Sequence, residues 1–442
     1  MTENRRDFLK KSSIAIAGAS AITSAATSVT KAAWVSSDET IKIGLVGCGG
    51  RGRGAASQAL TTKGPTSLVA MADAFDDQLQ PARKMLINQH SDKVDVPEER
   101  QFVGFEAYKQ LLEQDIDLII LATPPGFRPL HFEAAVNKGK HVFMEKPVAV
   151  DAAGVQRVLD ATRKAKENDL LVQVGLQRRH ETRYRETIKR LQDGAIGDIN
   201  FMRAYWNGAG VWTRPRKSGQ TEMQYQMRNW YYFNWLCGDH ITEQHIHNLD
   251  VINWLKNGFP VEAEGMGGRE VRTSKEHGEI FDHHMVEFTY ADGSKMLSQC
   301  RHIPGCKNSV SEWAHGSKGT ANISRQLIEM ASGEKWKFNK KEMAPGEPGG
   351  HQNEHHDLFR DLRAGVLPNE GEYGAMSTMT SILGRMATYS GKLIKMDKAL
   401  AQGRVVSPVD QFTTFDQDPP VMPREDMTYA VPIPGKTNVF KA

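Results

Sequence analysis

Four ionisable side chains recur with helical spacing near the middle of the chain. His240, Glu243, His247 and Asp250 follow one another at intervals of three, four and three residues, so on a single helix they would share one face. A carboxylate one turn from an imidazole can orient the ring and raise its pKa, which suits general acid/base catalysis. The pattern therefore predicts an acid/base group on this helix.

The same stretch allows two other interpretations. His240, Glu243 and His247 could bind a metal ion, although the spacing differs from His-Glu-x-x-His and one helix would have to supply most of the ligands. The side chains could also form a solvated polar face. We expect no metal ion.

A glycine-rich loop follows the first apolar run of the chain. Gly47, Gly49 and Gly52 form the pattern G-x-G-x-x-G, in which glycines allow a tight turn, approach of a pyrophosphate to the backbone and close packing of the next helix. The second apolar run ends at Asp73, at the spacing typical of the acid that holds an adenosine ribose. This context predicts a dinucleotide site rather than a glycine loop without a ligand.

Asp73 favours NAD over NADP because a carboxylate repels a 2′-phosphate. Arg51 and Arg53 lie nearby and keep NADP possible. Ligands of a doubly wound sheet bind beyond the carboxyl ends of its strands. We therefore expect these residues to bind the cofactor: Gly47, Gly49, Gly50, Arg51, Gly52, Asp73, Thr123, Pro124, Pro125, Glu145, Lys146 and Gln177.

Strands and helices alternate between residues 40 and 178. Apolar runs at 116–122, 141–144 and 170–174 are typical of buried strands, and helical segments separate them. Such alternation predicts a right-handed, doubly wound α/β sheet. We assign residues 40–178 to a Rossmann dinucleotide-binding domain.

Longer strands follow with few helices between them. We expect strands at 198–206, 261–272, 285–290 and 295–302, the last two joined by a hairpin turn. Strands joined in this way predict a mostly antiparallel sheet. We assign residues 179–442 to an α+β substrate domain with a proline-rich C-terminal arm.

A segment dense in aromatic and arginine side chains interrupts the second domain between residues 207 and 236. Trp212 and its neighbours could stack on sugar rings or hold anionic groups. They could equally pack this segment against the sheet or against another subunit.

The N-terminus has the features of an export signal. Arg5 and Arg6 precede a small-residue apolar stretch, Ile14–Val29, and small residues follow it. Paired arginines indicate the twin-arginine route, which carries folded proteins. We expect residues 1–33 to be a signal peptide, the export machinery to be a partner, and the location to be periplasmic or extracytoplasmic. A disordered basic N-terminus is the alternative.

Composition narrows the function classes further. The chain has 442 residues and a net charge of +3, without a basic run suited to nucleic acid. No long apolar segment follows the signal, so we expect no stable membrane insertion. The four cysteines have no zinc-finger spacing. Cys300 and Cys306 could pair, but free thiols are the stronger expectation.

Several motifs occur in a specific order along nearly the whole mature chain. The glycine loop is followed by Thr123-Pro124-Pro125, then Glu145-Lys146-Pro147, then an acid four residues before His247, then Asn248-Leu249-Asp250. This combination resembles the glucose–fructose oxidoreductase/inositol dehydrogenase (Gfo/Idh/MocA) family. The resemblance implies a large, open-faced sheet in the second domain, commonly used for homo-oligomerisation.

The resemblance also implies residue roles. Lys146 would contact the nicotinamide and the substrate, His247 would be the catalytic acid/base, and Glu243 would stand where many members have aspartate. The histidine-containing signature of the family's NAD-dependent glycosidases is absent from this sequence. The catalytic residues are then Lys146, Glu243 and His247, and the expected substrate-binding residues are Lys146, Arg179, Trp212, His240, Glu243 and His247.

The sequence thus predicts an exported NAD(P)-dependent oxidoreductase that acts on a sugar, polyol or glycoside. Free nicotinamide cofactor is scarce outside the cytoplasm, so we expect the cofactor to be held tightly. One alternative is an epimerising or glycoside-cleaving enzyme with no net redox change. Another is a non-catalytic dinucleotide-binding protein.

Overall fold

The computed structural model describes residues 39–344 and 347–441. The expected signal peptide, residues 1–33, lies outside the described residues. In the described part of the chain, no helix combines the length and the apolar character that crossing a bilayer requires.

The first sheet has six parallel strands in the order β3-β2-β1-β4-β5-β6. This is the doubly wound order in which ligands bind where the direction of winding reverses. Apart from the edge strand β3, its strands are largely buried, which explains their apolar runs. The strands are β1 (Ile41–Val46), β2 (Thr66–Asp73), β3 (Gln101–Val103), β4 (Leu118–Leu121), β5 (His141–Met144) and β6 (Val172–Val174).

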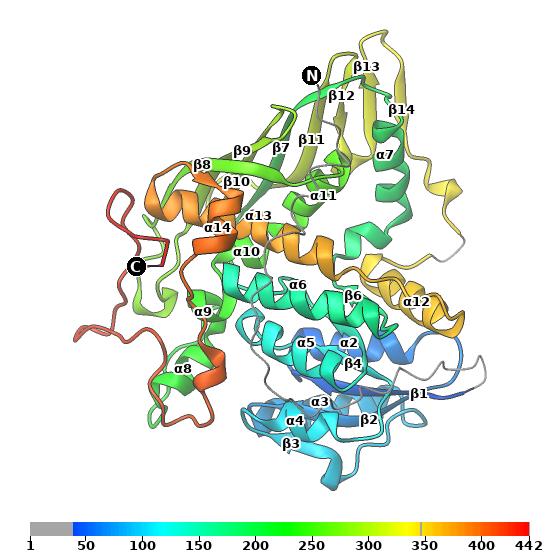
Figure 1. The fold of residues 1–442 in the computed structure, drawn as a ribbon, viewed down its shortest axis with the longest axis vertical. Helices are drawn as coiled ribbons and strands as arrows, with labels where there is room; N and C mark the ends of the chain where they lie inside the picture. Colours follow the sequence, from blue (N-terminus) through cyan, green and yellow to red (C-terminus); the bar gives the residue numbers. More distant parts are fainter. Residues whose placement is uncertain (1–38, 345–346, 442) are drawn as a thin grey trace, which may run out of the picture. The chain divides into compact units, whose positions relative to one another are not determined.

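Helices connect these strands, as the alternating pattern predicts (Figure 1). The carboxylate of Asp151 accepts a hydrogen bond from the backbone N–H of Gly154 at 2.8 Å and so caps the helix before β6. The helices are α2 (Gly50–Leu60), α3 (Asp76–Gln89), α4 (Ala107–Leu112), α5 (Arg128–Asn137) and α6 (Ala152–Glu167). The Rossmann fold is therefore confirmed.

The second sheet has nine strands in the order β14-β13-β12-β11-β7-β10-β9-β8-β15. Only β10 and β7 pair in parallel, so the expectation of a mostly antiparallel sheet is confirmed. The strands are β7 (Ile199–Gly208), β8 (Pro260–Gly268), β9 (His283–Tyr290), β10 (Lys295–His302), β11 (Ser309–Gly316), β12 (Gly319–Asn322), β13 (Leu327–Met330), β14 (Lys335–Lys337) and β15 (Ile394–Lys395).

The predicted extent of β8 is wrong at its carboxyl end. Sequence patterning carries this strand to residue 272, whereas it ends at Gly268. The Asp282 carboxylate accepts hydrogen bonds from three successive backbone N–H groups, those of residues 270, 271 and 272. These bonds hold the chain in a loop, so its N–H groups do not pair with a neighbouring strand.

Helices cover one face of the second sheet. The long helix α13 packs against β8 and β9 on one side and against α6 on the other (Figure 1). Alternate residues of β9 and β10 are therefore buried, and those between them are more exposed. The helices after α6 are α7 (Thr182–Gln192), α8 (Glu222–Arg228), α9 (Asn234–Cys237), α10 (His240–Glu243), α11 (Ile246–Lys256), α12 (Gly350–Arg363), α13 (Gly371–Ser390) and α14 (Met396–Gln402).

A late segment of the chain returns to the first domain. Leu358, Phe359 and Leu362 of α12 belong to the same buried apolar cluster as Leu45 and Ala56 of the Rossmann domain. Because α12 packs on α2, side chains from residues 350–363 lie beside the glycine-rich loop.

The segment after Pro408, here called the C-terminal arm, lies along residues 221–235. The Thr221 hydroxyl donates to the carbonyl of Phe415 at 2.7 Å, and Gln226 donates to that of Val421 at 2.6 Å. Most aromatic side chains of the 207–236 segment are buried together with arm residues in one apolar cluster: Tyr225, Tyr231, Tyr232, Phe233 and Trp235. Packing accounts for these aromatic residues.

Candidate active site

The glycine loop is tightly packed at Gly47 and Gly52 and faces open space at Gly49 and Gly50. Gly47 has φ +95°, and a Cβ there would lie 2.6 Å from the Ala122 carbonyl carbon. A Cβ on Gly52 would lie 1.8 Å from the oxygen of Gly47, whereas one on Gly49 or Gly50 would meet no atom within 4 Å. The loop is therefore packed where the chain turns and open where a pyrophosphate would approach.

Helix α2 begins at Gly50, directly beside this open space. Its N-cap residue, Gly49, has no side chain that could satisfy the N–H groups of the first turn. Unpaired N–H groups and the positive end of the helix dipole favour a bound phosphate. The loop and α2 thus fit the diphosphate of a dinucleotide.

Asp73 ends β2 next to this loop. Its Oδ2 accepts from the backbone N–H of Cys48 at 2.6 Å, and its Oδ1 accepts from that of Phe75 at 2.9 Å. Burial raises the pKa of this carboxyl, and the two backbone N–H groups oppose the rise. The carboxylate is held rigidly at the position where an adenosine ribose is bound in this fold.

Arg51 is paired with carboxylates from two parts of the chain. Its guanidinium forms ion pairs with Glu145, which follows β5, and with Glu354 of α12, the latter at 2.7 Å. Because these carboxylates neutralise the charge of Arg51, the guanidinium is poorly suited to bind the 2′-phosphate of NADP. This agrees with NAD as the cofactor. Contact between the cofactor and the side chains of Arg51 or Glu145 stays a prediction.

The other expected cofactor residues follow β4 and β6. Thr123 and Pro124 lead into a single 3₁₀ turn that begins at Pro125, and the Thr123 hydroxyl lies 3.2 Å from Nδ1 of His131. Gln177 starts another such turn after β6, and its Oε1 is buried without a partner among the described residues. Both turns lie beyond strand carboxyl ends, the edge where the sheet binds ligands.

Lys146 and Glu243 meet across the two domains. The Nζ of Lys146, just after β5, lies 3.0 Å from Oε1 of Glu243, at the end of α10. Nζ also donates to the backbone oxygen of Glu243. Both side chains are only 12% exposed, so the ammonium is held in one position at the edge of the sheet.

The expectation of one continuous helix carrying the four ionisable residues is wrong. The chain forms α10, then breaks at residues 244–245, and then forms α11. The break separates the side chains. His240 is fully buried, Glu243 contacts Lys146, and Asp250 forms a two-bonded ion pair with Arg179 at 2.8 and 2.9 Å.

His247 lies in the first turn of α11 and is 7% exposed. Its ring stacks with that of Trp206, with centroids 6.0 Å apart. Burial lowers the pKa of His247 well below its ordinary value, and the positive charges of Lys146 and Arg178 add to the effect. The imidazole is therefore neutral at physiological pH and able to accept a proton.

This environment corrects the expected role of Glu243. Sequence spacing predicts that Glu243 raises the pKa of His247, whereas that pKa is lowered and the carboxylate is hydrogen-bonded to Lys146. Nδ1 of His247 has no partner among the described residues. Glu243 therefore contacts Lys146, and its role in catalysis stays a prediction.

The buried carboxylate of Glu312 is hydrogen-bonded to α11, a contact that the sequence did not predict. Glu312 of β11 is fully buried, pairs with Arg178, and accepts from the side-chain amide of Asn248 at 2.6 Å. Asn248 follows His247 directly, so this network fixes the helix that carries the imidazole. An isolated acid within a strand pattern gives no sequence signal for such a contact across 64 residues.

The remaining expected substrate residues have different environments. Trp212 is 40% exposed and makes edge contacts with Trp230 and Tyr231. Arg179 lies over the Tyr373 ring at 3.9 Å and pairs with Asp250. The structure therefore leaves Trp212 accessible and places Arg179 in a structural ion pair.

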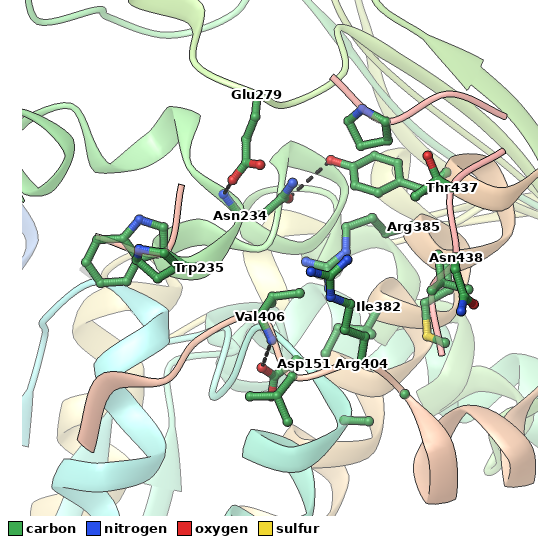
Figure 2. A pocket seen from close by; sticks show the side chains of 18 of the residues that line it. Asp151, Asn234, Trp235, Glu279, Ile382, Arg385, Arg404, Val406, Thr437 and Asn438 are labelled. Atoms are coloured by element: carbon green, nitrogen blue, oxygen red, sulfur yellow. Dashed lines mark hydrogen bonds between the residues drawn. The ribbon is translucent and has the colours of Figure 1, made fainter. Parts of the chain in front are cut away.

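A cavity of about 250 Å³ lies under the C-terminal arm, away from these residues. Figure 2 shows Glu279 beside Asn234, whose backbone N–H donates to the carboxylate at 2.9 Å. Burial raises the pKa of Glu279 to about 7. The lining does not include Lys146, Glu243 or His247, so this cavity is distinct from the candidate active site.

Comparison with known proteins gives the same architecture. Residues 41–176 match the model of an oxidoreductase family with an NAD-binding Rossmann fold, and residues 184–322 match the GFO/IDH/MocA C-terminal domain. Among solved structures, levoglucosan dehydrogenase in complex with NADH and levoglucosan has a TM-score of 0.63 at 16% identity, covering 81% of this chain and all of that one. The scyllo-inositol dehydrogenase of Lactobacillus casei has a TM-score of 0.61 at 21% identity, with the same coverage.

Curated relatives are named inositol 2-dehydrogenase. That of Klebsiella pneumoniae (strain 342) is 27% identical over 258 residues, which are 58% of this chain and 65% of the relative. That of Acidothermus cellulolyticus is 24% identical over 249 residues, 56% of this chain and 62% of the relative. The matches thus span just under two thirds of these relatives. The chain belongs to the Gfo/Idh/MocA family of oxidoreductases, and its first domain is an NAD-binding Rossmann domain.

Proposed function

We propose that this protein is an NAD-dependent oxidoreductase that oxidises a hydroxyl group of a sugar, polyol or glycoside. The observation that carries the proposal is the combination of the rigidly held Lys146 ammonium with the neutral His247 imidazole. The names of the relatives and of the structural neighbours support this substrate class.

The cofactor, when bound, supplies the hydride acceptor. The loop from Gly47 to Gly52 and the N-terminus of α2 would hold its diphosphate, and Asp73 would hold its adenosine ribose. The substrate would then bind beyond the carboxyl ends of β4, β5 and β6.

Lys146 binds and polarises the substrate hydroxyl. Its ammonium donates a hydrogen bond to the oxygen and stabilises the negative charge that develops as the proton leaves. Glu243 restrains Nζ of Lys146 through two contacts. The ammonium group therefore does not have to move as negative charge develops on the substrate oxygen.

His247 accepts the hydroxyl proton. Because burial keeps the imidazole neutral, the ring is in its basic form when the substrate binds. The stacking of its ring with Trp206 and the hydrogen bond from Asn248 to Glu312 limit the movement of His247. Trp212 is exposed enough to stack on a sugar ring.

Export by the twin-arginine route and tight cofactor retention are part of the proposal. Arg5 and Arg6 support export. The Phe75 ring, two residues after Asp73, stacks with Phe415 of the C-terminal arm at 4.9 Å. An arm seated beside the adenosine end would slow cofactor release, which favours a reaction without net redox change, such as an epimerisation or a transient oxidation.

A homo-oligomer is also proposed. Met266 of β8 and Met285 of β9 form a cross-strand pair and are 72% and 42% exposed. Apolar side chains that are exposed on an open sheet face suit contact with a second copy of the chain.

One experiment tests the proposed reaction. Purified protein is incubated with a panel of sugars, polyols and glycosides, and the products are identified by NMR with and without added NAD. A carbonyl or epimerised product from at least one compound, absent with His247→Ala, is expected. No product from any compound in the panel would contradict the proposal.

A further inference from the structure

A second cluster of side chains that could bind a ligand lies where the start of α10 meets β9. It takes no part in the reaction described above. Asp239, His240 and His284 each offer one ligand atom, and these atoms lie within 4.8 Å of one another. Asp239 and His240 are fully buried, and His284 is 3% exposed. These three side chains are therefore shielded from bulk solvent.

The spacing within the cluster suits a small cation. Oδ1 of Asp239 lies 3.3 Å from Nε2 of His284 and 3.8 Å from Nε2 of His240. In a tetrahedral zinc site, bonds of about 2.1 Å place neighbouring ligand atoms roughly 3.4 Å apart. The first pair already has this spacing, and a small rotation of His240 brings in the third atom.

His240 is the observation that points to a missing ligand. Both ring nitrogens are buried without a hydrogen-bond partner among the described residues. A buried ring with two unsatisfied nitrogens is unfavourable unless something binds there.

The other two side chains are held as metal ligands usually are. Nδ1 of His284 lies 2.9 Å from Oγ1 of Thr388, which leaves Nε2 directed at Asp239. Oδ2 of Asp239 accepts from the hydroxyl of Tyr389 at 2.6 Å and from the backbone N–H of Phe281 at 3.0 Å. Second-layer hydrogen bonds of this kind orient the ligating atoms and tune their affinity.

We propose that Asp239, His240 and His284 bind a divalent transition-metal ion of the zinc class through Oδ1 and the two Nε2 atoms. Two imidazoles and one carboxylate form a donor set typical of such ions. His302 stacks on His240 with ring centroids 4.2 Å apart, and its Nδ1 has no partner in the described chain. It offers a fourth ligand after a side-chain rotation.

The site has a structural consequence for the catalytic lysine. The ion would tie the start of α10 to β9, and α10 ends at Glu243, which restrains Lys146. The inference does not depend on the proposed reaction, because the metal is bound by residues outside the catalytic set.

The test measures metal content directly. The full chain, purified without a histidine tag from medium containing zinc, is analysed by plasma mass spectrometry. We expect about one equivalent per chain, retained through gel filtration. His284→Gln and Asp239→Asn should each lower the content at least about tenfold.

His283→Gln is the matched control. It removes a histidine from the adjacent position of β9, where the side chain is 43% exposed and pairs with Asp282 instead. This variant should keep the full metal content. Equal metal content in His284→Gln and in the unmodified protein would overturn the proposal.

A crystal of the unmodified protein decides the matter if the variants do not fold. Data collected at the metal absorption edge should show an anomalous peak between Asp239, His240 and His284. Folded, unmodified protein that shows no such peak and takes up no Co²⁺ would contain only a contact between Asp239 and His284 at this place, and the proposal would fail.

Discussion

The Nζ of Lys146 and Oε1 of Glu243 lie 3.0 Å apart, although 97 residues separate them in sequence. This ion pair joins the end of β5 in the Rossmann domain to α10 in the second domain. Burial is the main cause that lowers the pKa of His247, and the positive charge of Lys146 is the next.

Lys146→Ala should lower turnover while leaving dinucleotide affinity nearly unchanged. Removing a positioned donor to a developing negative charge costs about 10²–10³-fold in kcat. Calorimetry with NAD and steady-state kinetics measure the two effects separately. Near-normal turnover in this variant would remove Lys146 from the mechanism.

Glu243→Gln and Glu243→Ala should differ. The glutamine keeps an oxygen that accepts from Nζ, whereas alanine leaves only the backbone contact. We expect a loss of about tenfold or less for Gln and about 10²-fold for Ala, since the second variant frees the ammonium. Equal activity of the two variants would show that the side chain does not position Lys146.

The acid limb of the pH profile reports on His247. Its folded pKa is lowered, so the neutral base persists at pH values below its ordinary pKa. We expect kcat/KM to stay level from neutral pH down to about 6.5 and to fall only below that value. A decline centred above 6.5 would contradict a buried, neutral base.

Buried histidines should also make the fold sensitive to acid. Burial is the main cause that lowers the pKa of His141 to about 4 and those of His131 and His245 to about 3. Below about pH 6.5 these histidines bind more protons in the unfolded chain than in the folded one.

The free energy of unfolding should therefore fall by several kcal/mol as pH drops from 6.5 to 5, since each histidine contributes up to about 1.4 kcal/mol per pH unit. Urea denaturation at several pH values measures it. An unchanged denaturation midpoint over this interval would argue against neutral, buried rings.

Asp73→Ser should weaken the preference for NAD. The carboxylate is fixed by the backbone N–H groups of Cys48 and Phe75, and its charge disfavours a 2′-phosphate. We expect the ratio of NAD to NADP affinity to fall at least about tenfold, as measured by calorimetry. Tighter binding of NADP than of NAD by the unmodified protein would contradict this role and redirect attention to Arg53.

Local sequence signals predicted the first domain well. The apolar run of β1, the glycine loop and the position of Asp73 all depend on neighbouring residues, so their pattern is visible in the chain.

Contacts between distant segments were not predictable. Arg51 pairs with Glu354 across 303 residues, and Arg178 pairs with Glu312 across 134. The break between α10 and α11 was missed because the i, i+3, i+7 spacing of His240, Glu243 and His247 is compatible with one helix. In the folded chain His240 contacts His284 of β9 and His302 of β10, which local spacing could not indicate.

The most direct test of the account is reduction of bound cofactor in a single turnover. Protein loaded with one equivalent of NAD⁺ is mixed with the sugar and polyol panel, and absorbance of the reduced nicotinamide is followed. We predict a rapid rise with at least one compound, slowed by at least about 10²-fold in His247→Ala with equal cofactor content. An equally rapid rise in His247→Ala, or no rise with any compound in the unmodified protein, would contradict the account.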